Sequence, residues 1–493
     1  MKKPLIILMM CFWLLNGILF AQESFETIVH TTSSENGYGV FEDNSSNYIV
    51  LGSRNSIDAT DRFKPLIVKL NQSGSIISEL LIDKTDTTGY FSFGFQKPNG
   101  NYYLIGALSN AASPDKYNIA YKCEIDQELN IIWEKYFTIP APFRTHSISN
   151  FLITPENHVL VQGIADSSEY SYDYLLYISL FDMEGDLVKF KMYDNWKNYS
   201  VNRSSEMLFI PDSTNFLLVG GNVEYSFPRD WVEFDSELNL LDHGDVEDSL
   251  SYFLSPLSVV RLADGNFFAA NKSYGIEIPS QGDLELRIMD NEFNLIKDTI
   301  IYFEENKYLA LHNGAAYVNQ NSIWVCAFTN ALPHWSGTET YQIFNFDSQL
   351  HVNGWKDFGG DRRFWLYQVV ATSDGGCIVV GIIPETNGSV EQDIYINKIV
   401  PEDVITGIGE SCLPEKDQLS VIPNPFSNEI FIETELDDYQ FLLFNMDGRI
   451  VFKKQHLNTG EQHLSTKHLP PGIYIYSYSS KNRLFGHGKL VKF

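Results

Sequence analysis

The chain has 493 residues, of which 44% are hydrophobic and 14% aromatic, so it can bury a core and is not a disordered acidic polymer. Its 35 basic and 63 acidic side chains give a formal charge of −28. That balance argues against nucleic-acid binding, because phosphates are bound by clustered Lys and Arg. The length allows roughly two to four domains, or a large domain with a small one.

The first 21 residues have the pattern of a secretory signal peptide. Lys2 and Lys3 form a basic start, and an almost wholly apolar stretch follows up to Phe20. Cleavage after Ala21 would release the mature chain into the periplasm after Sec export. No later stretch has the ~18 uninterrupted apolar residues of a transmembrane helix, so we expect no transmembrane segment.

A short apolar run that closes on glycine recurs from the signal peptide to about residue 408. The spacing between successive closing positions lies between 51 and 57 residues. These positions are Gly52, Gly106, Gly163, Gly220, Asn271, Ala327 and Gly381. Because two of the seven lack glycine, the glycine is a preference and not a requirement.

A second motif recurs with the same period as the first. An apolar strand runs into Asp or Asn, then two polar residues, then Gly or a large apolar residue, and then a new strand. The motif begins at Asn71, Asp126, Asp182, Asp235, Asp290 and Asp347. Asp and Asn side chains bond the backbone two residues on, so this pattern is typical of a tight turn between strands. Two motifs in register predict a repeated four-stranded meander of about 55 residues.

The repeat predicts an all-β chain with a seven-bladed β-propeller over residues 22–408. Four strands in a unit of ~40–55 residues are typical of a propeller blade. The residues from Phe25 to Thr32 resemble a last strand without its preceding three, and the seventh unit has only a weak final strand. We therefore predict that this N-terminal strand completes the last blade and removes an open sheet edge.

One repeat carries a family resemblance. The sequence GGDRRFWLYQVVATSDGGCIVVGIIPETNGSVEQDIYINKI, from Gly359 to Ile399, resembles the repeats of secreted β-propeller proteins of Bacteroidetes-type bacteria. Cys377 and the missing tryptophan after Val404 depart from that pattern. The resemblance implies a propeller and no particular activity, because propellers serve many functions.

The pattern changes after the propeller. Residues 409–418 form a glycine- and proline-bearing linker, and residues 419–493 contain seven short strand-like runs. Runs such as EIFIET and IYIYSYS alternate apolar and polar residues, which indicates antiparallel strands with one buried face. This domain is predicted to be a compact immunoglobulin-like β-sandwich.

The same domain resembles the C-terminal sorting domain of the type IX secretion system. The resemblance rests on VIPNPFSNEIFIE, FNMDGRIV, LPPGIYIYSY and GKLVKF. It implies that the type IX machinery recognises the domain and carries the protein through the outer membrane, to be released or anchored at the surface. The matching residues are Pro423, Asn424, Pro425, Gly448, Gly472, Tyr474 and Lys489 to Lys492.

Sequence patterns for catalysis are missing. Phosphate-binding loops, GxSxG, HExxH and the calcium-loop pattern do not occur, and the histidines are scattered. We therefore assign no catalytic, cofactor-binding or metal-binding residue. The many carboxylates could hold a divalent cation, but no motif supports one, and they also keep a secreted domain soluble.

Two loops between strands combine aromatic and polar side chains that could stack on a sugar or hold a peptide. Solvated loops with incidental aromatics are the simpler interpretation. The residues in question are Tyr170, Tyr172 and Tyr174 in one loop, and His334 and Trp335 in the other.

Four cysteines remain after the signal peptide. Cys123, Cys326 and Cys377 each lie in an apolar run and are expected to be small buried hydrophobes. A Cys326–Cys377 bridge is disfavoured, because their positions in the repeat differ by three residues. The pairing of these three and of Cys412 is left open.

The leading functional hypothesis is a secreted or surface-displayed, non-enzymatic propeller that binds an extracellular protein or glycan. The alternative is an extracellular glycan- or peptide-degrading enzyme with its active site in the propeller funnel. Paired carboxylates about 5–10 Å apart would support a glycosidase. A structural adhesin differs from the leading hypothesis only in its partner.

Overall fold

The computed structural model divides the chain into two compact units, Met1–Ile301 with Lys307–Thr406, and Tyr302–Asn306 with Gly407–Phe493. Each unit is considered by itself. The structure describes residues 23–55, 63–110, 118–140, 144–166, 174–193, 206–210, 214–219, 231–244, 258–274, 282–301, 308–329, 340–360, 362–384, 392–404, 419–434, 439–445, 450–480 and 483–493. The predicted signal peptide and linker lie outside these ranges.

Unit 1 consists of antiparallel four-stranded meanders in series. The first three are β2 (Glu35–Glu42), β3 (Tyr48–Asn55), β4 (Phe63–Leu70) and β5 (Ile76–Leu81); β6 (Thr87–Gln96), β7 (Tyr102–Asn110), β8 (Asn118–Ile125) and β9 (Ile131–Phe137); and β10 (Arg144–Ile153), β11 (Val159–Asp166), β12 (Tyr174–Phe181) and β13 (Leu187–Tyr193). A single pairing of Thr145 with Asn118 joins the second and third meanders into one eight-stranded sheet.

The remaining meanders repeat this order. They are β14 (Glu206–Phe209), β15 (Phe216–Val219), β16 (Trp231–Phe234) and β17 (Leu240–Gly244); β18 (Ser258–Arg261), β19 (Phe267–Tyr274), β20 (Gly282–Met289) and β21 (Leu295–Ile301); β22 (Tyr308–Asn319), β23 (Ser322–Thr329), β24 (Thr340–Phe346) and β25 (Val352–Gly359); and β26 (Trp365–Ala371), β27 (Cys377–Pro384) and β28 (Gln392–Ile399). A short helix, α2 (Pro401–Val404), follows.

The last meander takes its fourth strand from the other end of the chain. Strand β1 (Phe25–Val29) pairs antiparallel with β28, from Phe25 opposite Lys398 to Val29 opposite Ile394. The predicted closure by an N-terminal strand is confirmed. The strand ends three residues before the predicted Thr32.

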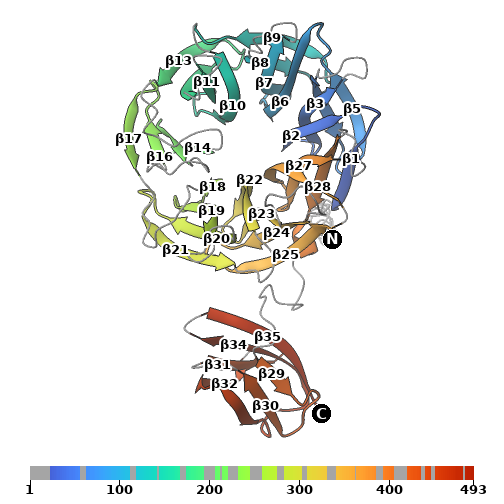
Figure 1. Cartoon of the computed structure of the whole chain (residues 1–493), viewed down its shortest axis with the longest axis vertical. Coiled ribbons are helices and arrows are strands. Elements are labelled where there is room, and N and C mark those ends of the chain that lie inside the picture. Colours follow the sequence, from blue (N-terminus) through green and yellow to red (C-terminus); the bar gives the residue numbers. More distant parts are fainter. Residues whose placement is uncertain are drawn as a thin grey trace, which may run out of the picture. The chain divides into compact units, whose positions relative to one another are not determined.

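The meanders of unit 1 form a ring with their first strands innermost (Figure 1). Most successive first strands contact each other, β10 contacts β7 and β8 of the preceding meander, and β2 contacts both β6 and β26, so the series closes on itself. This all-β arrangement is the predicted β-propeller. Among the described residues seven four-stranded groups can be traced, and the blade count of the full chain stays a prediction.

The turn motif of the repeats has a clear physical basis. In the turn that begins at Asp126, Oδ1 accepts hydrogen bonds from the backbone N–H groups of Glu128 and Asn130, at 3.0 and 2.7 Å. Leu129 has a φ of 67°, a left-handed conformation that glycine adopts without strain at Gly74 and Gly185. The leucine is nevertheless tolerated because only 4% of it is exposed, and its burial between blades offsets the backbone cost.

At Gly52, Gly106 and Gly381 two strands of one blade approach too closely for a side chain, whereas a Cβ at Gly163 would meet the Tyr177 ring. A Cβ at Gly52 would lie 1.9 Å from the carbonyl oxygen of Asn36, and one at Gly106 would lie 1.9 Å from that of Tyr90. Each contact lies beside a bulge in the first strand. The glycine preference in the repeat therefore follows from the bulge.

Hydrophobic cores fill the spaces between neighbouring sheets. One core combines Ile49, Leu51 and Ile67 of the first meander with Leu104 and Tyr121 of the second. Both faces of these strands are covered, which explains their nearly continuous apolar sequences. Cys123, Cys326 and Cys377 lie buried in such cores as free thiols, as predicted, whereas Cys412 lies outside the described residues.

Unit 2 is a two-layer β-sandwich. One sheet has the order β29 (Leu419–Ile422), β30 (Glu429–Thr434) and β33 (Gly460–Ser465), and the other has β32 (Ile450–Leu457), β31 (Tyr439–Phe444), β34 (Gly472–Ser480) and β35 (Arg483–Lys492). Alternate residues of β30 and β31 are buried in a shared core. The predicted seven-stranded sandwich is confirmed.

Candidate functional site

The aromatic loop residues singled out in the sequence lie almost entirely outside the described residues. This applies to Tyr170, Tyr172, His334 and Trp335, while Tyr174 is the first residue of β12. Their role as ligand contacts stays a prediction. Among the described residues no group of three His, Cys, Asp or Glu side chains could hold a metal ion.

Three tyrosines from three blades meet at the innermost strands. Tyr38 of β2 lies 5.2 Å from Tyr90 of β6 and 5.3 Å from Tyr367 of β26, measured between ring centroids. The planes are inclined at 59° and 66°, a tilted or edge-to-face contact that aromatic rings favour. Tyr367 is 36% exposed, so this tyrosine cluster offers a partly accessible aromatic surface.

Bulges in the first strands place two of these rings. Tyr38 lies between Gly37 and Gly39 at a register shift, and Tyr367 occupies the corresponding bulge in β26. The neighbouring inner strands lie so close that a Cβ at Gly39 would be 2.1 Å from the carbonyl oxygen of Ser92. Bulges commonly redirect side chains beside binding sites.

The phenols of Tyr38 and Tyr367 are neutral at physiological pH. Burial raises the pKa of Tyr38, and burial together with the neighbouring Tyr38 raises the pKa of Tyr367 to about 12. Each hydroxyl can therefore donate and accept hydrogen bonds.

The sequence contains a signal for this cluster that motif searching missed. Tyr38 and Tyr367 both stand 14 residues before a closing glycine, Gly52 and Gly381. That shared position indicates a shared place in the blade. Ring closure then brings the first and last repeats side by side.

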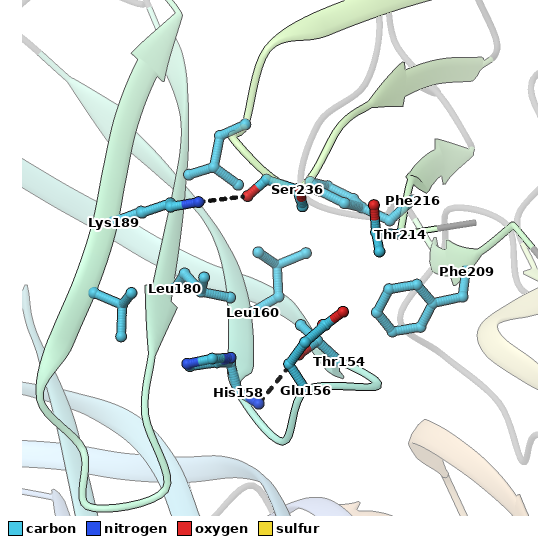
Figure 2. Close-up of a pocket in the computed structure, with 12 residues that line it drawn as sticks. Thr154, Glu156, His158, Leu160, Leu180, Lys189, Phe209, Thr214, Phe216 and Ser236 are labelled. Atoms are coloured by element: carbon cyan, nitrogen blue, oxygen red, sulfur yellow. Dashed lines mark hydrogen bonds between the residues drawn. The ribbon is translucent and has the colours of Figure 1, made fainter.

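A cavity of about 220 Å³ lies between the meanders β10–β13 and β14–β17 (Figure 2). Its apolar walls include Leu160, Leu180, Phe209 and Phe216. The other lining residues are Thr154, Glu156, His158, Val188, Lys189, Thr214, Ser236 and Leu238. No sequence motif pointed to this position.

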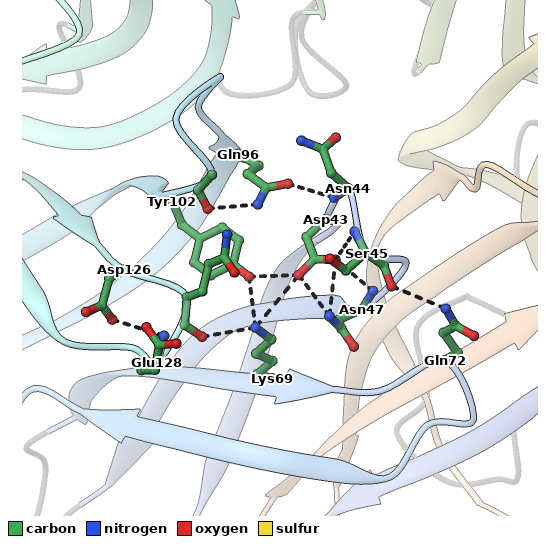
Figure 3. A network of polar contacts seen from close by, with 12 residues as sticks. Asp43, Asn44, Ser45, Asn47, Lys69, Gln72, Gln96, Tyr102, Asp126 and Glu128 are labelled. Atoms are coloured by element: carbon green, nitrogen blue, oxygen red, sulfur yellow. Dashed lines mark hydrogen bonds and ion pairs between the residues drawn. The ribbon is translucent and has the colours of Figure 1, made fainter.

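A polar network fills the corresponding interface between β2–β5 and β6–β9 (Figure 3). Lys69 Nζ donates to Tyr102 Oη and to the Gln127 carbonyl, both at 3.0 Å, and lies 3.8 Å from Asp43 Oδ2. Tyr102 Oη donates to Asp43 Oδ2 at 2.7 Å. Burial alone would raise the pKa of Asp43, but hydrogen bonds from the Asn47 backbone and Tyr102 outweigh it and lower the pKa.

Glu35 has its pKa raised by burial, as a catalytic acid would require. However, its side chain is fully buried, and its Oε1 accepts a hydrogen bond from Arg54 Nε at 2.8 Å. Arg54 also bonds Glu79 at 3.0 Å. This arrangement is an internal ion-pair network, and it presents no carboxyl group to a substrate.

Lys122 of β8 is a buried amine, and no carboxylate of the described residues forms an ion pair with it. It is 2% exposed, and its Nζ lies 3.3 Å from the centroid of the Phe181 ring. Burial, with a smaller contribution from Lys135, lowers the pKa of Lys122 from 10.5 to about 7. The lysine therefore opposes folding when charged.

The free energy of unfolding should rise with pH between about 7 and 10.5, because there the unfolded chain holds a proton that native Lys122 has released. We expect Lys122→Met to stabilise the protein by about 2 kcal/mol at pH 7 and to remove this rise. Urea unfolding across that pH range measures both effects. Lys356→Met is the matched control, because Lys356 is exposed while also lying 5.3 Å from an aromatic ring centroid. An unchanged pH dependence in Lys122→Met would contradict the assignment.

Unit 2 brings the two ends of its predicted motif together. Asn424 Nδ2 donates to the Lys489 carbonyl at 2.8 Å, and Asn424 Oδ1 accepts from the Val491 N–H at 2.9 Å. Both peptide bonds that precede Pro423 and Pro425 are cis. The PNP segment is thus hydrogen-bonded to the terminal strand β35.

The other motif residues have distinct environments. Lys492 is 7% exposed, and its Nζ donates to the Thr466 carbonyl at 2.6 Å, whereas Lys489 is exposed. Tyr474 Oη donates to the Pro470 carbonyl at 2.5 Å, and Gly472 has a φ of 155°. Gly448 lies outside the described residues.

Residues 420–492 match the family model of the secretion system C-terminal sorting domain. Residues 420–492 form a type IX sorting domain. This domain indicates export to the cell surface or secretion, and handling by the type IX machinery. In the part of the chain that the structure describes, no helix is long and apolar enough to cross a membrane.

Several solved structures resemble this chain in fold at low sequence identity. A protein of unknown function from Dyadobacter fermentans is 10% identical, with 76% of this chain and 98% of that chain covered and a TM-score of 0.41. A PL25 ulvan lyase is 9% identical, with 74% and 94% covered and a TM-score of 0.45. A neuraminidase-like protein of a bat influenza virus, subtype N10, is 9% identical, with 76% and 98% covered and a TM-score of 0.36. No curated protein matches the chain.

Proposed function

We propose that this protein is an extracellular binding module that holds a neutral glycan at the tyrosine cluster of its propeller, without catalysing a reaction on it. The sorting domain supplies the route to the outside of the cell. The observation that carries the binding role is the contact of Tyr38, Tyr90 and Tyr367 at the inner strands of three blades.

The chemistry of the cluster suits a sugar without charge. Aromatic faces pack against the apolar C–H face of a sugar ring, while the phenolic hydroxyls offer directional hydrogen bonds. The pKa of Tyr367 is about 12, so its phenol remains a neutral hydrogen-bond donor. The net charge of −28 disfavours an acidic polysaccharide, because the field of the protein repels it.

Tyr367→Ala is expected to weaken glycan binding by about tenfold, or ~1.4 kcal/mol, because it removes the most exposed ring of the cluster. A glycan array identifies a neutral ligand, and isothermal titration calorimetry measures its affinity for both proteins. Tyr136→Ala is the matched control, because Tyr136 is 49% exposed on an outer strand. Circular dichroism verifies that both variants fold.

Three outcomes would change the proposal. Equal affinity of the native protein and Tyr367→Ala would move the glycan away from the tyrosine cluster. Release of oligosaccharides or peptides at ordinary turnover would favour the alternative of a degrading enzyme with an active site in the funnel. If only an extracellular protein is captured, and Tyr367→Ala abolishes capture, the ligand class changes from glycan to protein.

A further inference from the structure

The cavity lies between β10–β13 and β14–β17. At the corresponding place between β2–β5 and β6–β9, the side chains of Asp43, Lys69 and Tyr102 fill the space. Thr154 begins the first turn of its meander as Asp43 does, and Leu180 is the penultimate residue of the third strand as Lys69 is. Phe216 begins the second strand of the next meander as Tyr102 does. The residues that fill the first interface are therefore replaced by shorter or apolar ones at this interface.

The replacement leaves both space and an apolar wall. Thr154 is shorter than an aspartate, and Leu180 is shorter than the lysine that reaches across to the Gln127 carbonyl at the other interface. Leu160, Leu180 and Phe216 belong to one buried cluster, and Phe209 packs against it. Figure 2 shows these side chains around the same space. The space of about 220 Å³ is a pocket open to solvent, because Glu156, Val188 and Ser236 at its rim are exposed, and a ligand can therefore enter it.

The charges around the cavity favour a neutral occupant. Lys189 Nζ already donates to the Ser236 carbonyl at 3.1 Å and forms an ion pair with Glu237 at 2.5 Å, so its charge is balanced. The carboxylate of Glu156 adds a negative charge beside it, which disfavours an anion. A cation would find no buried carboxylate here, because Glu156 is exposed and hydrated and Thr154 stands where Asp43 contacts Lys69 at the other interface.

The uncharged polar side chains that line the cavity favour an occupant with a hydroxyl group. Thr214 and Ser236 each carry a hydroxyl that can donate and accept hydrogen bonds, and Thr154 can still donate, although its Oγ1 already accepts from the His158 N–H at 3.1 Å. Phe209 and Phe216 offer aromatic surface. Benzene fits a dry cavity of ~150 Å³, so the volume here accommodates one ring with a short substituent.

We propose that this interblade cavity binds a single neutral aromatic ring that carries a hydroxyl group, either a free phenol or the side chain of a tyrosine in a peptide. The apolar walls hold the ring, and the hydroxyl-bearing side chains hold its polar end. The site is separate from the tyrosine cluster, so its failure and the failure of the proposed glycan binding are distinguishable.

The test titrates the purified protein with p-cresol by isothermal titration calorimetry, in parallel with toluene and p-toluate. We expect p-cresol to bind about fivefold or more tightly than either, since toluene lacks the hydroxyl and p-toluate is charged. A parallel titration with N-acetyl-tyrosinamide separates the sources: affinity equal to that of p-cresol assigns the site to a tyrosine side chain, and no binding assigns it to a free phenol.

Val188→Trp should fill the cavity from its edge and weaken p-cresol binding by about tenfold or more. Val188 lines the cavity and is 44% exposed, so this change spares the core. Ile77→Trp is the matched control, because Ile77 has the same position in β5 and is 53% exposed, beside the interface that the Lys69 network fills. We expect the Ile77→Trp variant to bind p-cresol with the affinity of the native protein.

The double variant Thr154→Asp with Leu180→Lys places the equivalents of Asp43 and Lys69 in the cavity. We expect this variant not to bind p-cresol. If this double variant fails to fold, the Val188→Trp result alone decides. The proposal is overturned if p-cresol does not saturate the native protein, if toluene or p-toluate binds equally well, or if Val188→Trp binds p-cresol with native affinity.

Discussion

Deletion of residues 419–493 is expected to leave almost all of the protein in the periplasm of a host with a type IX system. The expectation follows from the match of residues 420–492 to the sorting domain. These residues belong to a compact unit with its own buried core, so their removal should not unfold the propeller. Cell fractionation with immunodetection measures the distribution of the truncated and full-length proteins.

A fusion provides the converse test. Residues 419–493 attached to an unrelated exported carrier should bring that carrier to the surface or into the medium, because recognition depends on the domain. The carrier alone is the control. Normal surface appearance of the truncated protein would refute a role of this domain in its export.

Val29→Asp is expected to destabilise the propeller by about 3 kcal/mol or more, because it buries a charge without a partner. Val29 is 2% exposed and lies in a core with Val40 and Ile378. It is the last residue of β1, the strand that completes the final blade. The change therefore weakens the closure between the two ends of the ring.

Ile28→Asp is the matched control for this effect. Ile28 is the preceding residue of the same strand, but it is 37% exposed, so a charge there remains hydrated. We expect its midpoint in urea unfolding to lie close to that of the native protein and far above that of Val29→Asp. Equal unfolding midpoints for the two variants would show that β1 does not contribute to the folded ring.

The repeat could be recognised from sequence because each of its signals has a local cause. The Asp126 turn depends on hydrogen bonds from residues two and four positions on, and Gly52 depends on the backbone of the adjacent strand. The order of residues in the sorting domain was equally informative. Only the structure explains why Pro423 to Pro425 and the terminal strand occur together, since Asn424 bonds both Lys489 and Val491.

The candidate sites were less accessible to sequence analysis. In the sequence the aromatic loop residues stand as isolated groups, whereas the tyrosine cluster draws one residue from each of three blades. Tyr38 and Tyr367 are separated by almost the whole propeller sequence, and β1 paired with β28 closes the ring between their blades. The cavity likewise depends on Thr154 and Phe216, which belong to different meanders.

The amino-acid sequence by itself determined the all-β class, the repeating meander, the closing strand and the sorting domain, because hydrophobic alternation, turn chemistry and motif order act over short distances along the chain. The tertiary structure alone decided which blades meet and what lies between them. Contacts such as Tyr38 with Tyr367, and the space left beside Leu180, depend on side-chain volumes across sheets that are distant in sequence.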